Sequence, residues 1–129
     1  LKTKIYKDKR GFFKEVEKKK ILKKKFIFDC FSFSKKNTLR GMHFQNKPFA
    51  EKKIVTCISG KVFDVVIDLR KDSKTFLQYY SKNLSSCNLE SIIIPEGFAH
   101  GFQVMEKDSE LIYLHTESYN KDAAERALR

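Results

Sequence analysis

The sequence predicts an all-β domain, either a sandwich or a barrel of about eight strands, with little helix. Three observations carry this prediction. Short apolar segments recur from residue 26 onward at spacings of about 10 residues. Turn-forming residues separate them, at Gly60, Asp72–Ser73, Ser85–Asn88, Pro95–Gly97 and Lys107–Ser109. In residues 61–69 the side chains alternate with the period of two that is typical of a strand.

The expected strands are, in chain order, FIFDCFSF (26–33), LRGMHFQ (39–45), KKIVTCIS (52–59), KVFDVVIDL (61–69), FLQYYSKNL (76–84), SIIIP (91–95), FAHGFQVM (98–105) and ELIYLHT (110–116). Only the two ends of the chain admit helix. These are residues 14–25 and, with the stronger pattern, residues 120–129, where Asn120 is a candidate cap.

The segment 61–69 has the clearest alternation. It places Phe63, Val65, Ile67 and Leu69 on one face, and Val62, Asp64, Val66 and Asp68 on the other. For Asp64 the sequence leaves two interpretations open, a site residue or a side chain that faces water. For Asp68 the water-facing interpretation is favoured.

Length and composition indicate one folded domain, residues 1–129. The 129 residues are 41% hydrophobic and include twelve Phe and five Tyr, enough for an aromatic-rich core. Three cysteines without CxxC spacing favour reduced thiols in a cytoplasmic protein over disulfides or a zinc cluster. No apolar run approaches the ~20 residues of a membrane span, and no signal peptide is evident. Because the chain starts at Leu1 and stops at Arg129, we expect a fragment truncated at its C-terminus.

The formal net charge of +11 is concentrated at the start of the chain. Residues 1–25 contain 12 Lys or Arg and 3 Asp or Glu, whereas residues 26–129 contain 15 and 13. A basic arm can attract phosphate or nucleic acid, or it can be a solvated lysine-rich loop. The run KKKILKKK has no arginine for bidentate base contacts, which favours the solvated loop and no nucleic-acid partner.

The block PEGFAH at residues 95–100 fits P-x-G-x-x-H, the second metal-binding motif of small double-stranded β-helix barrels, the cupin-like jelly rolls. The first motif requires an H-x-H with a carboxylate soon after, but His43 is the only earlier histidine. His115 could supply a third ligand, although nothing in the sequence around it marks it as one. A metal would have too few ligands, so we predict the barrel without the metal.

Seven blocks in the same order resemble the dTDP-4-dehydrorhamnose 3,5-epimerase family, cupin-like isomerases of dTDP-sugars. The blocks are DKRGFF with Glu15 after it, LRGMHFQ, KIV, GKVFDVVIDLRKDSKTF, NLSS, PEGFAHGF and ELIYLHTESY. The resemblance implies epimerisation at C3 and C5 of a nucleotide-linked 4-keto-6-deoxyhexose, without a cofactor. The product would enter dTDP-rhamnose and surface-polysaccharide synthesis.

The same resemblance implies roles for individual residues. His43 would be the base that makes an enolate, Lys53 would stabilise it, and Tyr113 would return a proton on the opposite face. Inversion needs groups on both faces, because a single base would mostly return its proton to the face it came from. The implied substrate-binding residues are Arg10, Phe13, Glu15, Arg40, Asp64 and His100. His100 would donate a hydrogen bond to the sugar, with Ala99 and Gly101 keeping the wall beside its ring narrow.

The resemblance also implies a homodimer, in which the amino-terminal segment crosses to the partner and delivers Arg10 and Glu15. The chain departs from the family in two places. It has Phe28, Asp29 and Cys30 where members usually have Gln-Asp-Asn, and it ends before the aspartate that pairs with the base histidine.

Other interpretations remain open on the residues alone. A buried histidine is more often a core residue, a barrel tyrosine usually packs, and Lys53 beside Lys52 could be surface charge. Single-site epimerisation is an alternative. A ketoisomerase on the same scaffold is disfavoured by HGF and Tyr113. A non-catalytic sugar- or nucleic-acid-binding barrel would not need His43, Lys53 and Tyr113 together.

Overall fold

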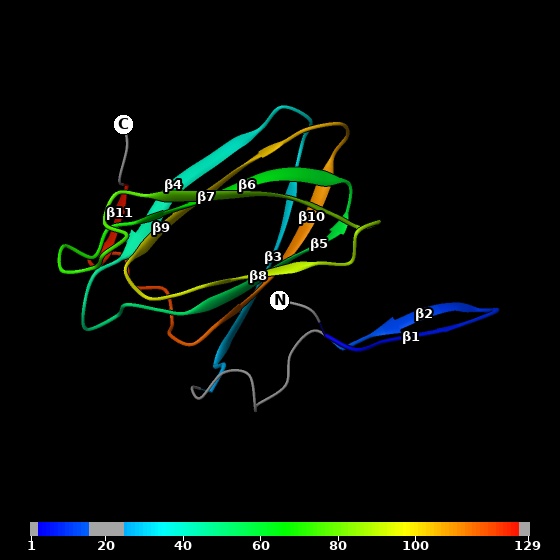
Figure 1. Cartoon of the computed structure of the whole chain (residues 1–129), viewed down its shortest axis with the longest axis horizontal. Helices are drawn as coiled ribbons and strands as arrows, with labels where there is room; N and C mark the ends of the chain where they lie inside the picture. The colour runs from blue at the N-terminus through cyan, green and yellow to red at the C-terminus, as the bar shows by residue number, and fades with distance from the viewer. Residues whose placement is uncertain (1–2, 16–24, 127–129) are drawn as a thin grey trace.

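Two antiparallel sheets form a cupin-like jelly roll in the computed structural model, which describes residues 3–15 and 25–126 (Figure 1). One sheet has four strands in the order β3-β10-β5-β8, and the other has five in the order β11-β4-β9-β6-β7. A separate hairpin, β1-β2, precedes them. The described residues contain strands and turns but no helix, and therefore none that could cross a membrane. The predicted all-β fold is confirmed.

The eight predicted strands are all present, as β3 (Phe28–Ser34), β4 (Leu39–Gln45), β5 (Lys53–Ser59), β6 (Lys61–Asp68), β7 (Tyr79–Ser85), β8 (Ser91–Ile94), β9 (Phe98–Val104) and β10 (Ser109–His115). Three further strands were not predicted, namely β1 (Ile5–Asp8), β2 (Gly11–Lys14) and β11 (Ala124–Arg126). Strand β7 begins three residues later than expected, because residues 71–77 form turns that return the chain to Asp68, whose carbonyl accepts from Leu77 N at 2.7 Å.

The helix predicted for residues 120–129 is wrong over its described part. Asn120 does cap a turn, since its Oδ1 accepts from the backbone N–H groups of Asp122 and Ala123, both at 3.0 Å. The chain then extends as β11 and pairs with β4, Ala124 opposite Gln45. Pairing with a sheet edge has replaced the local helix propensity. Of the other predicted helix, 14–25, Lys14 lies in β2 and residues 16–24 fall outside the described residues.

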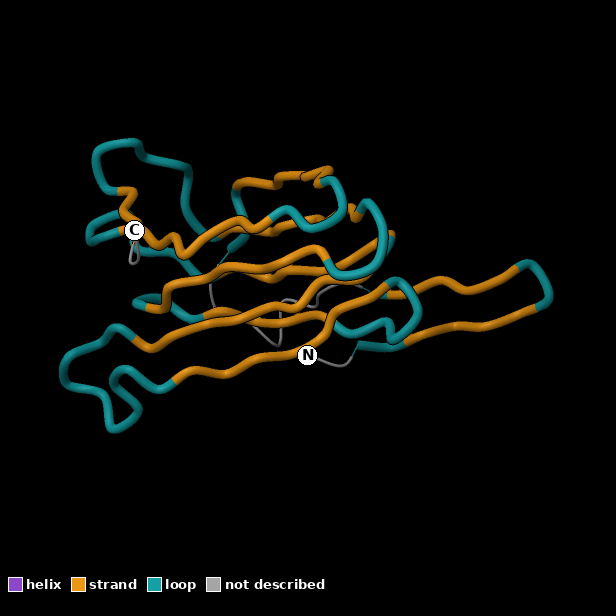
Figure 2. The backbone as a smooth tube through the Cα atoms, turned by 90° about the horizontal axis from the view of Figure 1, so that it is seen from above, coloured by secondary structure: helices purple, strands orange, loops and turns teal. Residues whose placement is uncertain are grey.

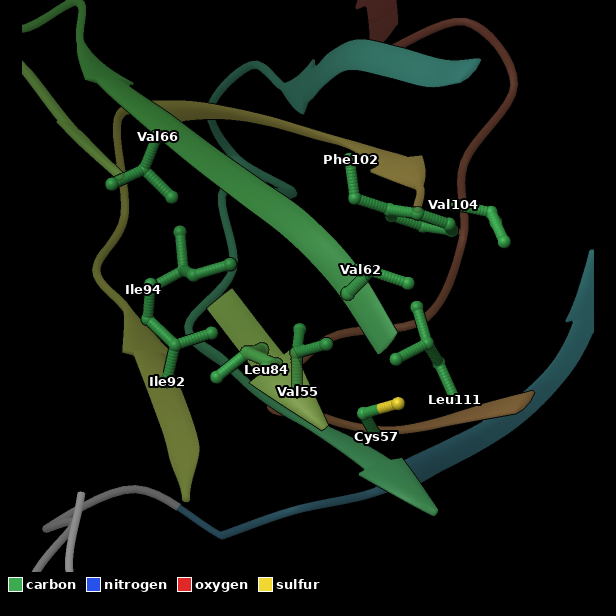
Figure 3. Packing of buried hydrophobic residues seen from close by; sticks show 10 residues of the cluster. All are labelled: Val55, Cys57, Val62, Val66, Leu84, Ile92, Ile94, Phe102, Val104 and Leu111. Carbon is green, nitrogen blue, oxygen red and sulfur yellow. The ribbon is translucent and has the colours of Figure 1, made fainter. Parts of the chain in front are cut away.

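The core lies between the two sheets and is filled by aliphatic side chains, with one Phe and one Cys (Figure 3). Sheet β3-β10-β5-β8 contributes Val55, Cys57, Ile92, Ile94 and Leu111, and the other sheet contributes Val62, Val66, Leu84, Phe102 and Val104. The inward face of β6 carries Asp64 and Asp68 as well as Val62 and Val66, so both carboxylates are buried. The water-facing interpretation of these two aspartates is therefore wrong.

The β1-β2 hairpin extends away from the two sheets (Figures 1 and 2). Its apolar side chains are exposed within this chain, most of all Phe12 and Phe13 at 56% and 69%. Lys14 at the base of the hairpin donates hydrogen bonds to the carbonyl of Leu89 and to Ser91 Oγ. The hairpin is thus fixed at one end, while Phe12 and Phe13 stay more than half exposed in their own subunit.

Candidate active site

A pocket of about 610 Å³ receives side chains from both sheets, and we call it the central pocket. Strands β4 and β9 supply Arg40, His43 and His100, whereas β5 and β10 supply Lys53, Tyr113 and His115. An adjoining hollow of about 460 Å³ shares His43, Lys53 and Tyr119 with it. Another hollow, of about 660 Å³, is lined largely by loops and contains neither His nor Tyr. The acid–base groups therefore gather at the central pocket.

Two glycines bring β4 and β9 close together behind the histidines. Gly41 has a φ of 127°, and a Cβ on it would lie 2.5 Å from the Cα of Gly101. A Cβ on Gly101 would in turn meet Met42 Sδ at 2.7 Å. The strands shift register here and bring His43 opposite His100. Gly101 therefore serves the close approach of two backbones, a role different from the expected narrowing of the wall beside His100.

His100 and Asp64 form a buried pair in the wall of the central pocket. His100 Nε2 lies 2.7 Å from Asp64 Oδ2, and the two side chains are diagonal neighbours on β9 and β6. Burial and the nearby Lys53 lower the pKa of His100, so the imidazole is neutral at neutral pH. Its Nε2–H then donates to Asp64, which leaves Nδ1 as an acceptor. A neutral His100 would accept a hydrogen bond from a sugar hydroxyl, and the expected donor role would require protonation.

Lys53 places a half-buried ammonium at the point where the central pocket and the adjoining hollow meet. Burial lowers the pKa of Lys53, while the carboxylates of Glu51 and Asp64 oppose this effect. Asp64 Oδ1 is buried and has no hydrogen-bond partner in the part of the chain that the structure describes. Its negative charge is therefore available to attract the Lys53 ammonium. Such a cation can stabilise an oxyanion that forms in the pocket.

Tyr113 presents its hydroxyl from the sheet opposite to His43. Tyr113 Oη lies 3.1 Å from Ser32 Oγ on the neighbouring strand β3. Burial raises the pKa of Tyr113 to about 12, so the hydroxyl stays protonated at neutral pH. A protonated phenol on one wall and the exposed imidazole of His43 on the other are suited to donate and accept protons.

Arg40 provides a cation at the edge of the central pocket. Its Nε donates to Ser34 Oγ at 2.8 Å, which fixes the guanidinium while the residue remains exposed. The other predicted binding residues, Arg10, Phe13 and Glu15, do not reach this pocket in their own subunit. Arg10 pairs with Asp8 at the tip of the hairpin, where Nη2 lies 2.7 Å from Oδ2. The structure therefore brings His43, Lys53, Arg40, Asp64, His100 and Tyr113 together but leaves the hairpin residues apart.

Several residues in or beside the central pocket were not predicted from the sequence to take part in a substrate site. Ser32 and Ser34 anchor Tyr113 and Arg40, Cys30 and Tyr119 line the wall, and Glu51 pairs with His115. A signal was present for His115, because residues two apart on a strand share a face, and Tyr113 was already a candidate. No group of three His, Cys, Asp or Glu side chains in residues 3–15 and 25–126 could hold a metal ion.

Known proteins match this chain over most of its length. The dTDP-4-dehydrorhamnose 3,5-epimerase of Shigella flexneri is 43% identical over 124 residues, which are 92% of this chain and 68% of the relative. A crystal structure of the Bacillus anthracis enzyme of that name, with TDP and PPi bound, has a TM-score of 0.93 at 37% identity. This match covers 98% of this chain and 75% of that one.

A Legionella pneumophila dTDP-6-deoxy-D-glucose-3,5-epimerase, in complex with dTDP-4-keto-L-rhamnose, has a TM-score of 0.90 at 37% identity. The match covers 96% of this chain and 69% of that one. The family model described as dTDP-4-dehydrorhamnose 3,5-epimerase matches residues 1–129. The chain therefore belongs to the dTDP-4-dehydrorhamnose 3,5-epimerase family of isomerases.

Proposed function

We propose that the central pocket epimerises a dTDP-linked 4-keto-6-deoxyhexose at C3 and C5, in dTDP-rhamnose synthesis. One observation carries the assignment of roles. His43 lines the pocket from β4 of one sheet, and the protonated hydroxyl of Tyr113 lines it from β10 of the other. Family membership and the dTDP-sugar in the Legionella pneumophila relative support the choice of substrate.

The reaction follows from the acidity of carbons beside a ketone. His43 takes the proton from C3 or C5, and the electron pair of the broken C–H bond moves into an enolate. The ammonium of Lys53 stabilises the negative charge that develops on the C4 oxygen. Tyr113 then gives its proton to the opposite face of the same carbon, forming the new C–H bond. Solvent reprotonates the tyrosinate and removes the proton from His43, so the net change is inversion alone.

The remaining side chains would bind and orient the substrate. Arg40 would contact the pyrophosphate, since a guanidinium pairs well with phosphate oxygens. His100, which donates to Asp64, would accept from a sugar hydroxyl through its free ring nitrogen. This scheme assigns no step to a metal or an organic cofactor, because the ketone of the substrate already provides the acidifying group.

The functional unit would be a cytoplasmic homodimer in which each hairpin reaches the pocket of its partner. The support is physical: Phe12 and Phe13 are exposed, and Arg10, Phe13 and Glu15 do not line the central pocket of their own subunit. A second copy of the chain would cover the two phenylalanines and deliver these three residues.

Solvent-deuterium exchange tests the proposed reaction. The protein is incubated with dTDP-4-keto-6-deoxyglucose in D₂O, and NMR follows the hydrogens at C3 and C5. Loss of both signals with inversion at both carbons is the expected result. Exchange at one carbon would identify a single-site epimerase, and binding without exchange would identify a non-catalytic binding module.

A further inference from the structure

Glu51 and His115 form a second carboxylate–imidazole pair at the central pocket, and the scheme above gives it no role. Glu51 Oε2 lies 2.8 Å from His115 Nδ1, and the two side chains are only 13% and 12% exposed. His115 lines the central pocket, and Glu51 lines the adjoining hollow. A nearly buried carboxylate is costly without a strong hydrogen bond, so this contact fixes both side chains.

The backbone next to the pair is also fixed. Lys52 N donates to Thr116 Oγ1 at 2.9 Å, and Thr116 N donates to the carbonyl of Lys52 at 3.0 Å. His115 lies between its register partners, Phe28 on β3 and Lys53 on β5. Backbone hydrogen bonds and strand pairing therefore fix where His115 lies, and the hydrogen bond to Glu51 fixes the orientation of its ring.

His115 is in turn the middle ring of an aromatic row that ends at Tyr113. Its ring is 5.2 Å from that of Phe28 and 6.0 Å from that of Tyr113, the latter at an interplanar angle of 20°. Residues 113 and 115 share one face of β10, so the stacking follows from the strand period. Tyr113 is thus held at its hydroxyl by Ser32 and along its ring by His115.

We infer that Glu51 and His115 are positioning residues for Tyr113, a role that rests on the proposed function. Tyr113 has to deliver its proton to one face of a planar enolate, so a small tilt of the phenol ring misdirects the hydroxyl. His115 limits that tilt, and Glu51 holds His115 in place. The pair acts through Tyr113, whereas proton abstraction by His43 occurs from the opposite sheet and does not require it.

The test compares Glu51→Ala with Glu51→Gln. Both variants lose the carboxylate charge and with it the attraction to Lys53, but the amide oxygen of glutamine can still accept from His115 Nδ1–H. The readout is the ratio of inverted product to deuterium exchange on a dTDP-4-keto-6-deoxy sugar. We expect this ratio to fall about tenfold in Glu51→Ala and to recover most of its value in Glu51→Gln. The matched control is Glu106→Gln, an exposed carboxylate paired with Lys61, which should leave the ratio unchanged.

A wild-type ratio in Glu51→Ala, or an equally low ratio in Glu51→Gln, would overturn the inference. If Glu51→Ala fails to fold by near-UV circular dichroism, His115→Ala takes its place, because it removes the ring that packs on Tyr113. A wild-type ratio in His115→Ala would also overturn the inference. Failure of the proposed function would look different: the wild type would show no exchange, or His43→Asn would retain it.

Discussion

His100 Nε2 lies 2.7 Å from Asp64 Oδ2, and neither side chain is more than 5% exposed. The hydrogen bond joins β9 to β6 in the wall of the central pocket. Because burial lowers the pKa of His100 below the ordinary value of 6.5, the folded protein holds this imidazole neutral where an unfolded chain would protonate it. Stability must therefore depend on pH.

The first prediction is that His100→Gln reduces the loss of stability in mild acid. As pH falls below about 6.5, the unfolded chain binds a proton at His100 before the folded protein does, so the free energy of unfolding decreases. Each unit by which folding lowers the pKa corresponds to about 1.4 kcal/mol in the free energy of unfolding that is lost in acid. Glutamine does not titrate and can still donate to Asp64. The free energy of unfolding of His100→Gln should therefore change less with pH than that of the wild type. Urea unfolding at pH 7.5, 6.5, 5.5 and 4.5 gives the free energy of unfolding of both proteins as a function of pH, and an equal dependence on pH would contradict the prediction.

The second prediction is that Asp68→Asn destabilises the fold by about 2 kcal/mol. Asp68 accepts from Arg70 Nε and Nη2, both at 2.9 Å, and from Thr75 Oγ1 at 2.6 Å, while only 1% exposed. These donors, Arg70 foremost, hold the pKa of Asp68 far below its ordinary value of 3.8. The stabilisation is present above pH 3.8 and is lost as pH falls toward the lower folded pKa.

Asp8→Asn is the matched control, since Asp8 forms an ion pair with Arg10 on the exposed hairpin. It should leave the urea midpoint nearly unchanged, because exposed ion pairs contribute little. Equal shifts of the midpoint in the two variants would show that burial of the Asp68 pair is unimportant.

The third prediction separates His43 from Tyr113. His43→Asn should lower deuterium uptake and epimer formation together by ~10²–10⁴-fold, because no enolate forms. Tyr113→Phe keeps the ring and the enolate but removes the hydroxyl that protonates the opposite face. Deuterium should then still enter with retention of configuration, while inverted product becomes scarce. Equal loss of exchange and inversion in Tyr113→Phe would mean that Tyr113 is structural or is itself the base.

The fourth prediction concerns the hairpin. We expect a dimer by light scattering at micromolar concentration, and weaker association in Phe13→Ser. Mixing two inactive variants tests whether the hairpin reaches the partner's pocket. His43→Asn subunits keep an intact hairpin, and Arg10→Ala subunits keep the base His43. Mixed dimers should therefore recover part of the activity that each variant lacks alone. Mixed dimers without recovered activity would show that each hairpin serves its own subunit, or none.

The strands were predictable because their signal is local. In β6 the period of two correctly grouped Val62 and Val66 with Asp64 and Asp68. It could not show that this face points inward, because the opposite face, with Phe63, Val65 and Ile67, has no aspartate and is the more apolar of the two. Burial of the aspartates depends on partners contributed elsewhere, His100 from β9 for one and Arg70 after the strand for the other.

The site was predictable only in part, for the same physical reason. His43, His100, Lys53 and Tyr113 stand in recognisable blocks, and the fold gathers them in one pocket. Glu51 and His115 are 64 positions apart in the chain, and their pairing depends on the registration of β5 with β10. The strand β11 was not predicted because Ala124–Arg126 extend by pairing with β4, a contact that no local pattern encodes.

The base and the acid of the proposed mechanism belong to different sheets, so the hydrophobic core acts as a spacer that sets the gap between them. Phe102, which both fills the core and lines the central pocket, lies at the boundary of these two roles. Interiors are close-packed, so a change of core volume moves one sheet against the other. In this protein the proportion of inverted product should therefore depend on core packing. It should change with displacements of the sheets that are too small to unfold the chain.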